Sequence, residues 1–251
     1  MKLVAHRGAS LERPENTLES YLCAASLGAY AVEGDIRQTR DGEYVLFHDP
    51  DLQRLADSSA LVSEVTFAEM QALLAEHGQP LLTLDALCKG FSASPYAETV
   101  RILFHVKLDH ADTPERHALY RSLTYENSGI HAVCGLQSAE EVRLCRKYFA
   151  SEDILAFMPH AEDYPKFYAA GAGIIRLWEQ WLDCVTPAQV HAECPNADVF
   201  IMCNRQGIGV NGSAESLTKI AQMGADGALF NDIRMGIAWQ KSFGENSDKL
   251  R

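Results

Sequence analysis

Four features are missing from this sequence, and each absence argues against a class of protein. The seven cysteines are odd in number and show no C-x-x-C spacing, which disfavours a disulfide framework or a zinc knuckle and favours reduced thiols in the cytoplasm. No apolar run approaches the roughly 18 residues that a membrane-spanning helix requires. The first four residues lead into a polar motif and do not resemble a signal peptide. No G-x-G-x-x-G follows a predicted strand, which disfavours an open, doubly wound nucleotide-binding sheet.

Positive charge is also scarce. Lysine and arginine number 22 against 34 aspartates and glutamates, and the net charge is -12. This balance disfavours a broad nucleic-acid or anionic-membrane surface. An acidic protein that binds an anionic small molecule must do so locally, through a metal ion or a few basic residues. We therefore expect a cytoplasmic protein with a small-molecule substrate, no nucleic acid and no integral membrane association, as either a monomer or a homo-oligomer.

Apolar segments of strand length alternate with helical patterns along the 251 residues. Eight strands with helices between them predict an α/β fold, the (β/α)₈ TIM barrel. The segment 16–27 illustrates the helical pattern, because Asn16 or Thr17 can cap it and Gly28 can end it. The expected strands are 3–6, 31–36, 101–106, 132–136, 154–158, 173–177, 199–202 and 227–230.

One excursion interrupts this alternation after the second strand. Residues 44–47 are expected to pair with that strand across the turn at 40–42. Residues 49–79 are expected to form a short insertion that holds one amphipathic helix, from 66 to about 75. We predict a single domain over 1–243 with a closing helix at 233–241, followed by a polar tail over 244–251.

Polar side chains follow the predicted strands at the end where a barrel carries its active site. Chemistry in such barrels takes place at the C-terminal ends of the strands. The sequence therefore predicts that these residues lie around one rim. They are His6, Arg7, Glu33, Asp35, His48, His105, Lys107 and Trp178, together with Asn204 and Asn231.

Glu33 and Asp35 are two residues apart, so on a strand they face the same side. Two buried carboxylates on one face repel each other unless positive charge lies between them. Oxygen ligands in this arrangement suit a hard divalent cation such as Mg²⁺ or Ca²⁺. A salt-bridge network with Arg7, Arg37 or Lys107 would also answer the two charges, and the spacing leaves both interpretations open.

His6 and His48 each follow an apolar strand and precede a polar residue. A single histidine in such a place is usually a packed core or rim residue. Two of them beside an arginine favour a general base and a general acid. Arg7 and Lys107 would then neutralise phosphate oxygens.

Several of these residues have a second, purely structural interpretation. Lys107 is suited to a phosphate or to an ion pair at the rim. Glu15, after Pro14, is suited to the site or to the first turn of a helix, where the helix dipole favours a carboxylate. Trp178 and Trp181 are suited to an apolar wall for a glycerol chain or to ordinary packing.

The first fifty residues resemble the glycerophosphodiester phosphodiesterase family. The matching segments are A-H-R-G-A at 5–9, P-E-N-T-L at 14–18, E-x-D at 33–35, T-x-D-G at 39–42 and V-L-F-H-D at 45–49. The resemblance implies a metal-dependent barrel enzyme that hydrolyses glycerophosphodiesters to glycerol 3-phosphate and an alcohol.

The resemblance also implies roles for individual residues. His6 and His48 match the family's acid/base pair. Glu33 and Asp35 match metal ligands. Glu15 matches a glutamate that holds the site together from the first loop. With Trp178 as the apolar wall, the substrate-binding residues would be Arg7, Glu15, Lys107 and Trp178.

This sequence departs from the family pattern at the ends of three strands. The family carries Glu-x-Lys on the third strand, where this chain has His105-Val106-Lys107. If His105 is the third metal ligand, the site is softer, so Mn²⁺ and Zn²⁺ join Mg²⁺ and Ca²⁺ as candidates. The seventh strand ends Met202-Cys203-Asn204, without the family's aromatic residue, and the eighth ends Phe230-Asn231-Asp232.

These departures lie at the rim where the substrate would bind, so they bear on the identity of the substrate more than on the class of reaction. Two alternatives remain open. One is a phospholipase D-like hydrolase of lysophospholipids, with the insertion as a lid over a longer chain. The other is a non-catalytic barrel that binds a phosphate ligand.

Overall fold

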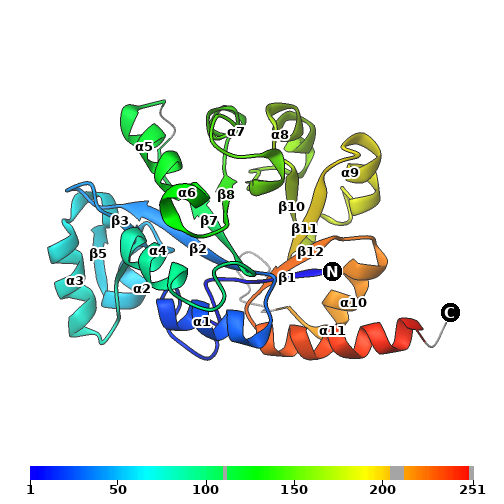
Figure 1. Ribbon diagram of the computed structural model, residues 1–251, viewed down its shortest axis with the longest axis horizontal. Helices are drawn as coiled ribbons and strands as arrows, with labels where there is room; N and C mark the ends of the chain where they lie inside the picture. Colours follow the sequence, from blue (N-terminus) through cyan, green and yellow to red (C-terminus); the bar gives the residue numbers. More distant parts are fainter. Residues whose placement is uncertain (110–111, 204–211, 249–251) are drawn as a thin grey trace.

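A closed barrel of parallel strands forms the centre of the molecule (Figure 1). The computed structural model describes residues 1–109, 112–203 and 212–248. Strand β1 pairs in parallel with both β2 and β12, and this double pairing closes the barrel. The predicted (β/α)₈ fold is confirmed. The barrel strands are β1 (Lys2–Ala5), β2 (Ala31–Gln38), β7 (Arg101–Val106), β8 (Ala132–Leu136), β9 (Ile154–Ala156), β10 (Ile174–Trp178), β11 (Asp198–Met202) and β12 (Gly227–Phe230).

Helices surround the barrel, and their ends follow local signals in the sequence. Thr17 caps α1 through its side chain, and Gly28 ends that helix with a φ of 102°. Helices α1 and α11 lie side by side at the bottom of Figure 1. The outer helices are α1 (Leu18–Leu27), α4 (Leu84–Ser92), α5 (Pro114–Leu123), α6 (Tyr125–Ser128), α7 (Ala139–Cys145), α8 (Tyr164–Ala170), α9 (Pro187–Glu193), α10 (Ala214–Gln222) and α11 (Ile233–Asp248), with 3₁₀ turns η2 (Ser151–Asp153), η3 (Ala161–Asp163) and η4 (Glu179–Trp181).

Alternation along each strand separates two apolar layers. Outward-facing strand residues pack against the helices, and inward-facing residues fill the barrel. The interior cluster includes Val4, Leu103, Leu155, Ile174 and Leu229. These side chains close the middle of the barrel. A ligand can therefore not occupy the middle of the barrel, and the C-terminal rim of the strands is the place where we expect it to bind.

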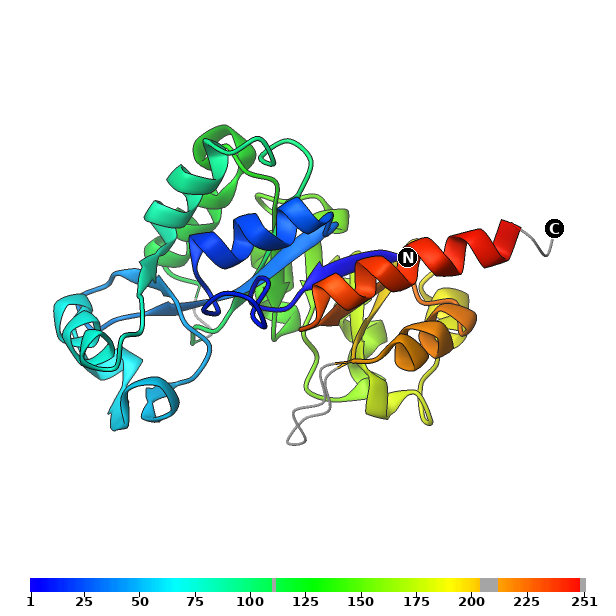
Figure 2. The ribbon, with the colours of Figure 1, turned by 90° about the horizontal axis from the view of Figure 1, so that it is seen from below.

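The insertion has a small apolar core of its own. Strand β3 (Tyr44–Leu46) pairs antiparallel with β2, and β6 (Leu82–Thr83) pairs with β3. Figure 2 shows the insertion, in cyan, at one end of the molecule. The expected pairing of residues 44–47 with the second strand is confirmed. Within residues 49–79 the sequence predicts only the helix, because the strands there are too short to show alternation. The other elements are β4 (Asp51–Leu52), α2 (Gln53–Ala56), β5 (Ser58–Leu61), η1 (Val62–Glu64) and α3 (Phe67–Glu76).

The last helix is longer than the sequence predicts. Helix α11 runs through Asp248, so residues 244–248, expected to belong to a polar tail, are helical. A polar segment can continue a helix that has already begun, because each added residue forms one further backbone hydrogen bond. Within the described ranges, no helix is both long and apolar enough to cross a membrane.

Candidate active site

The turn after β1 brings His6 and Arg7 to the rim in a strained conformation. Arg7 has a φ of 61° and Gly8 a φ of 83°, and positive φ is uncommon for any residue other than glycine. The backbone N–H of Arg7 donates to Glu33 Oε2 at 3.0 Å. The Ser20 hydroxyl donates to the Arg7 carbonyl at 3.3 Å. The turn thereby orients Arg7 toward the carboxylates of β2.

Gly34 allows the two carboxylates of β2 to share a buried site. A Cβ at position 34 would lie 1.5 Å from the Tyr21 hydroxyl oxygen, so only glycine fits there. That hydroxyl donates to Asn16 Oδ1 at 3.0 Å. The Asn16 amide in turn donates to Asp35 Oδ2 at 3.3 Å and its oxygen accepts from the Asp35 backbone N–H. Asn16 and Tyr21 therefore fix the position of Asp35 from the first helix.

Glu33, Asp35 and His105 form a cluster that fits a divalent cation. One ligand atom from each residue lies within 4.8 Å of the others. Glu33 and Asp35 are almost fully buried. Burial and the neighbouring charge of Asp35 raise the pKa of Glu33 to about 8. Two oxygens and one imidazole nitrogen are a donor set for a divalent metal, and such an ion would allow both carboxyls to ionise at neutral pH.

His105 is uncharged in this environment. Burial lowers its pKa to about 4 although Asp35 acts in the opposite direction. Its Nδ1 lies 3.4 Å from Asp35 Oδ1, and its Nε2 lies 3.0 Å from Gln137 Nε2. An ionised Asp35 can only accept, so the Nδ1–H tautomer of His105 donates to Asp35 while Nε2 accepts from the Gln137 amide.

The carboxylates also meet two cations, as the salt-bridge interpretation expects. Lys107 Nζ lies 2.9 Å from Asp35 Oδ1, and Arg7 Nε lies 3.8 Å from Asp35 Oδ2. Burial alone would raise the pKa of Asp35, but the charge of Lys107 and the hydrogen bond from His105 hold it well below its usual range. Lys107 also donates to the His48 carbonyl at 2.9 Å. Ion pairs and a candidate metal cluster therefore share the same residues.

His6 and His48 face each other across the rim. Their ring centroids are 6.5 Å apart and their planes meet at 85°. His6 Nδ1 donates to Asn231 Oδ1 at 2.6 Å, and His48 Nδ1 donates to Asp49 Oδ1 at 2.7 Å. Each of these bonds orients its ring and leaves Nε2 as the remaining nitrogen. Burial, followed by the charge of Arg7, lowers the pKa of His6 to about 3, so His6 is neutral near pH 7.

Glu15 holds arginines and does not face the carboxylate cluster. Arg7 Nη1 donates to both oxygens of Glu15 at 3.2 Å. Arg54, from the insertion, donates to Glu15 Oε1 at 2.5 Å and to Asp49 Oδ2 at 2.6 Å. Partial burial would raise the pKa of Asp49, but hydrogen bonds from His48 and Arg54 outweigh it and lower the pKa strongly. Glu15 thus connects the first loop, the insertion and Arg7.

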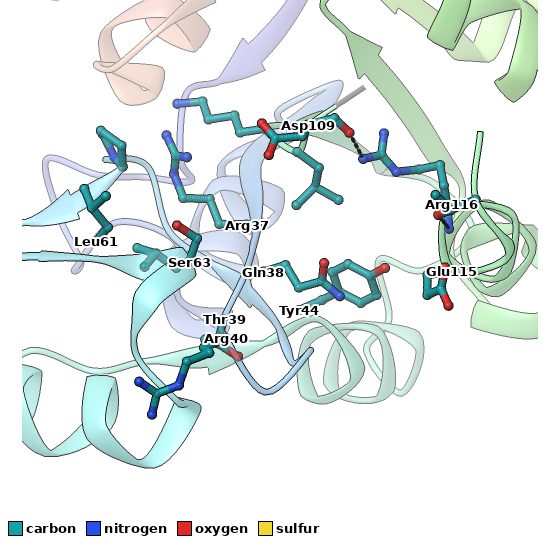
Figure 3. A pocket seen from close by; sticks show the side chains of 15 residues that line it. Arg37, Gln38, Thr39, Arg40, Tyr44, Leu61, Ser63, Asp109, Glu115 and Arg116 are labelled. Atoms are coloured by element: carbon teal, nitrogen blue, oxygen red, sulfur yellow. Dashed lines mark hydrogen bonds between the residues drawn. The ribbon is translucent and has the colours of Figure 1, made fainter. Parts of the chain in front are cut away.

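A cavity of about 470 Å³ adjoins the site under the insertion (Figure 3). Arg37 and Gln38 line it from β2, Leu61 from β5 and Arg116 from α5, with Lys107 at the wall shared with the site. Arg37 donates to the His48 carbonyl through Nε and Nη2, at 3.1 and 2.9 Å. The carbonyl of His48 therefore connects this cavity with the candidate acid/base pair.

The structure brings most of the predicted residues together at one rim. Trp178 lies at the end of β10, half-buried, where its ring is 4.6 Å from Arg176 Cζ. Asn204, expected at the seventh strand, lies outside the described residues. The sequence gives Asn16 as a candidate helix cap, Asp49 as part of a motif and Asn231 as a rim residue, and it predicts no further role for them in the site. It predicts no role in the site for Tyr21, Gln137 or Arg176. Arg176 had a readable signal, because it is the one charge in the apolar strand Ile174–Trp178.

Comparison with known sequences identifies relatives of the first half of the chain. Residues 6–120 match the family model of the glycerophosphoryl diester phosphodiesterases. The probable glycerophosphodiester phosphodiesterase 1 of Mycobacterium tuberculosis is 45% identical over 97 residues, which are 34% of this chain and 35% of that protein. Human glycerophosphodiester phosphodiesterase 1 is 43% identical over 70 residues, 28% of this chain and 21% of that protein. The alignments therefore span only 35% and 21% of these two relatives, and they confirm the predicted resemblance over that segment.

Solved structures share the fold over almost the whole chain. A glycerophosphodiester phosphodiesterase from Thermotoga maritima has a TM-score of 0.71 at 18% identity and covers 95% of this chain and 97% of its own. An Oleispira antarctica phosphodiesterase, solved with the product sn-glycerol-3-phosphate, also has a TM-score of 0.71, at 21% identity, with 95% of each chain covered. At these identities the comparison establishes the barrel fold.

Proposed function

We propose that this chain, whose residues 6–120 match the glycerophosphoryl diester phosphodiesterase family, hydrolyses glycerophosphodiesters to glycerol 3-phosphate and an alcohol. The observation that carries the proposal is the placement of two histidines 6.5 Å apart beside a buried cluster of Glu33, Asp35 and His105. A binding protein needs a cation for its phosphate but has no need of two opposed imidazoles. The pair therefore favours catalysis over a silent phosphate binder.

The two histidines divide the proton transfers. His6 is neutral near pH 7 and offers Nε2, so it takes the proton from the attacking hydroxyl, of water or of the glycerol 2-position. The new P–O bond forms as the bond to the departing alcohol breaks. His48, whose Nδ1 is held by Asp49, donates a proton to the departing oxygen. If the 2-hydroxyl attacks first, water completes the hydrolysis in a second step.

Cations and carboxylates of the chain orient the phosphate. Arg7 and Lys107 lie at the carboxylate cluster, and their N–H groups can turn to phosphate oxygens when a ligand enters. Glu33, Asp35 and His105 would hold a divalent ion, which supplies positive charge that stabilises the transition state. Glu15 positions Arg7, and Trp178 forms an apolar wall at the far side of the rim.

The insertion gives little support to a lysophospholipid substrate. Val62 and Met70, proposed as part of a lid, are buried in the insertion's own core. Leu61 is the large apolar side chain of this segment that is exposed, at 38%. A packed cap therefore describes the insertion better than a lid that opens for an acyl chain.

The direct test is release of glycerol 3-phosphate from glycerophosphocholine and glycerophosphoethanolamine, after EDTA treatment and after Mg²⁺, Ca²⁺, Mn²⁺ or Zn²⁺ is restored. We expect activity that is lost with chelator and recovered with one of these metals. Turnover of lysophosphatidylcholine alone would favour the phospholipase D-like alternative, and no turnover with any metal would favour the binder.

Substitution of the histidines tests the acid/base roles. His6→Ala and His48→Ala should each lower kcat by about 10²- to 10⁴-fold, because each removes one proton transfer from the transition state. His77→Ala, at an exposed position after α3, is the matched control and should keep full activity. Near-full turnover by either active-site variant, with an unchanged circular dichroism spectrum, would rule out the two-histidine mechanism.

A further inference from the structure

One guanidinium inside the barrel has N–H groups that find no acceptor in the part of the chain that the structure describes. Arg176 faces inward on β10, between the inward residues Ile174 and Trp178, and is 4% exposed. Its Nε and Nη1 are fully buried and have no hydrogen-bond partner among residues 1–109, 112–203 and 212–248. No carboxylate of these residues forms an ion pair with it, and burial alone lowers its pKa, to about 9. A buried charge is normally paired, because leaving water costs several kcal/mol.

Aromatic rings hold this guanidinium but do not satisfy it. The Arg176 Cζ lies 5.0 Å from the ring centre of Phe157, 4.6 Å from that of Trp178 and 5.4 Å from that of Trp181. The faces of these rings attract a cation. They offer no oxygen to the N–H groups in the guanidinium plane, which are shaped for the two oxygens of a carboxylate or phosphate. The donors therefore remain available to an oxyanion.

The guanidinium lies close to the candidate metal cluster. The ring of Phe157 that contacts Arg176 also stacks on His105, with centroids 3.9 Å apart and planes at 16°. Strand β10 is four strands from β2 in either direction around the closed barrel. Arg176 therefore approaches the rim from the side opposite Glu33 and Asp35.

Arg176 differs from the other cations of the site because no carboxylate of the described residues pairs with it. Lys107 is paired with Asp35, and Arg7 with Glu15. A phosphate that binds Lys107 or Arg7 must therefore compete with a carboxylate of the chain for the same N–H groups. The positive charge of Arg176 is not neutralised by any described carboxylate. An oxyanion that binds there displaces no carboxylate, so its binding free energy is more favourable at Arg176 than at Lys107 or Arg7.

We propose that Arg176 binds an oxyanion of the substrate from the β10 side of the rim. This inference rests on the proposed function for the identity of the substrate, but not for the binding of an anion. The oxyanion has two sources in a glycerophosphodiester: the phosphate that is cleaved, or an acidic group on the alcohol. Arg176 is then a substrate-binding residue that acts together with Arg7 and Lys107.

A binding measurement tests the proposal without any turnover. Trp178 and Trp181 flank Arg176, whereas Trp239 lies on the outer helix α11, where it stacks on Phe243. Tryptophan fluorescence should therefore respond when inorganic phosphate or glycerol 3-phosphate is titrated into the metal-free protein. In Arg176→Met the dissociation constant for both should rise about ten- to a hundredfold, as expected for loss of a charged hydrogen bond.

Two control variants separate charge from packing. Arg143→Met, at an exposed arginine of α7, should bind phosphate as the wild type does. Arg176→Lys keeps the charge without the two-pronged donor and should bind with intermediate affinity. If Arg176→Met lowers Tm yet leaves both dissociation constants unchanged, Arg176 is a packing residue and the proposal is wrong.

Turnover distinguishes the two sources of the oxyanion. Glycerophosphoserine differs from glycerophosphoethanolamine by one carboxylate. If Arg176 contacts the cleaved phosphate, Arg176→Met lowers kcat/KM equally for both. If it contacts the alcohol, the loss is confined to glycerophosphoserine. Equal kcat/KM of variant and wild type for both substrates would overturn the proposal. Failure of the wild type to hydrolyse either substrate would reject the proposed function, and the phosphate titration would still decide whether Arg176 binds an anion.

Discussion

Single residues decide whether the chemistry of this site is available. The E-G-D segment of β2 carries two candidate metal ligands, and the glycine between them is required because the Tyr21 hydroxyl occupies the space of a side chain. The same hydroxyl holds Asn16, which holds Asp35. The packing of the first helix against β2 therefore also sets the orientation of the candidate ligand Asp35.

The contact at Gly34 predicts a strong effect of the smallest possible side chain. Gly34→Ala places a Cβ 1.5 Å from the Tyr21 oxygen and 2.7 Å from its Cζ, so Tyr21 must move. We expect a loss of about 1–3 kcal/mol in the free energy of unfolding, measured by denaturant titration, together with weaker metal binding.

A double variant shows whether Tyr21 is the cause. Tyr21→Phe alone should cost about 1 kcal/mol for the lost hydrogen bond to Asn16. Combined with Gly34→Ala it should restore part of the lost stability, because the closest atom is gone. Wild-type stability in Gly34→Ala would contradict the steric explanation.

Elements differ in how their local sequence relates to their packing. The barrel strands and outer helices have strong patterns, and β7 and β8 begin and end where the sequence predicts. The insertion has a weaker pattern, and its short strands β4 and β5 pair only with each other. Its core, with Phe47, Leu52 and Met70, is separate from the cores of the barrel.

A separate core predicts local unfolding of the insertion. Met70→Ala removes a fully buried side chain and should destabilise the insertion by about 2–5 kcal/mol. Hydrogen exchange should then accelerate over residues 49–79 while the amides of β1 and β7 keep their protection. Gln71→Ala, exposed on the same helix, is the matched control. Equal acceleration in the barrel strands would show that the insertion and the barrel unfold as one unit.

At the scale of the whole molecule, the buried carboxyl of Glu33 links stability to pH and to metal. Its pKa is raised from 4.5 to about 8 in the fold. Above 4.5 the unfolded chain loses this proton while the folded chain keeps it, so the stability that Glu33 contributes falls as pH rises and is fully lost above about 8. A bound divalent ion reverses this loss, because it favours the ionised carboxyl.

Below about pH 6.5 the lowered pKa values of His6 and His105 act in the opposite direction, because the unfolded chain protonates these imidazoles and the folded chain does not. We therefore expect the Tm of the metal-free protein to fall mainly between about pH 6.5 and pH 8. A divalent metal should raise Tm most at the upper end of that range. Glu33→Gln keeps an oxygen that accepts from the Arg7 N–H, and it should weaken both the dependence of Tm on pH and the dependence of Tm on metal. Glu126→Gln, at an exposed glutamate, should leave them unchanged. A pH dependence that is the same in Glu33→Gln and wild type would exclude Glu33 as the responsible group.

The sequence by itself determined the barrel and the members of the rim. Strand and helix periods are local properties, and the rim follows from them because chemistry in this fold lies where strands end. His6, Glu33, Asp35 and His48 could be found in this way. The linear order of residues also carried the resemblance of the first fifty residues to a known family.

Only the tertiary structure decided which groups are charged, paired or isolated. The raised pKa of Glu33, the Tyr21 contact that requires Gly34 and the burial of the Arg176 guanidinium away from every described carboxylate each depend on residues far apart in the chain. Burial and Coulomb interactions act through space, over distances that closure of the barrel sets and that sequence spacing does not contain. For that reason the sequence predicted where the site lies, and the fold determined how its charges are balanced.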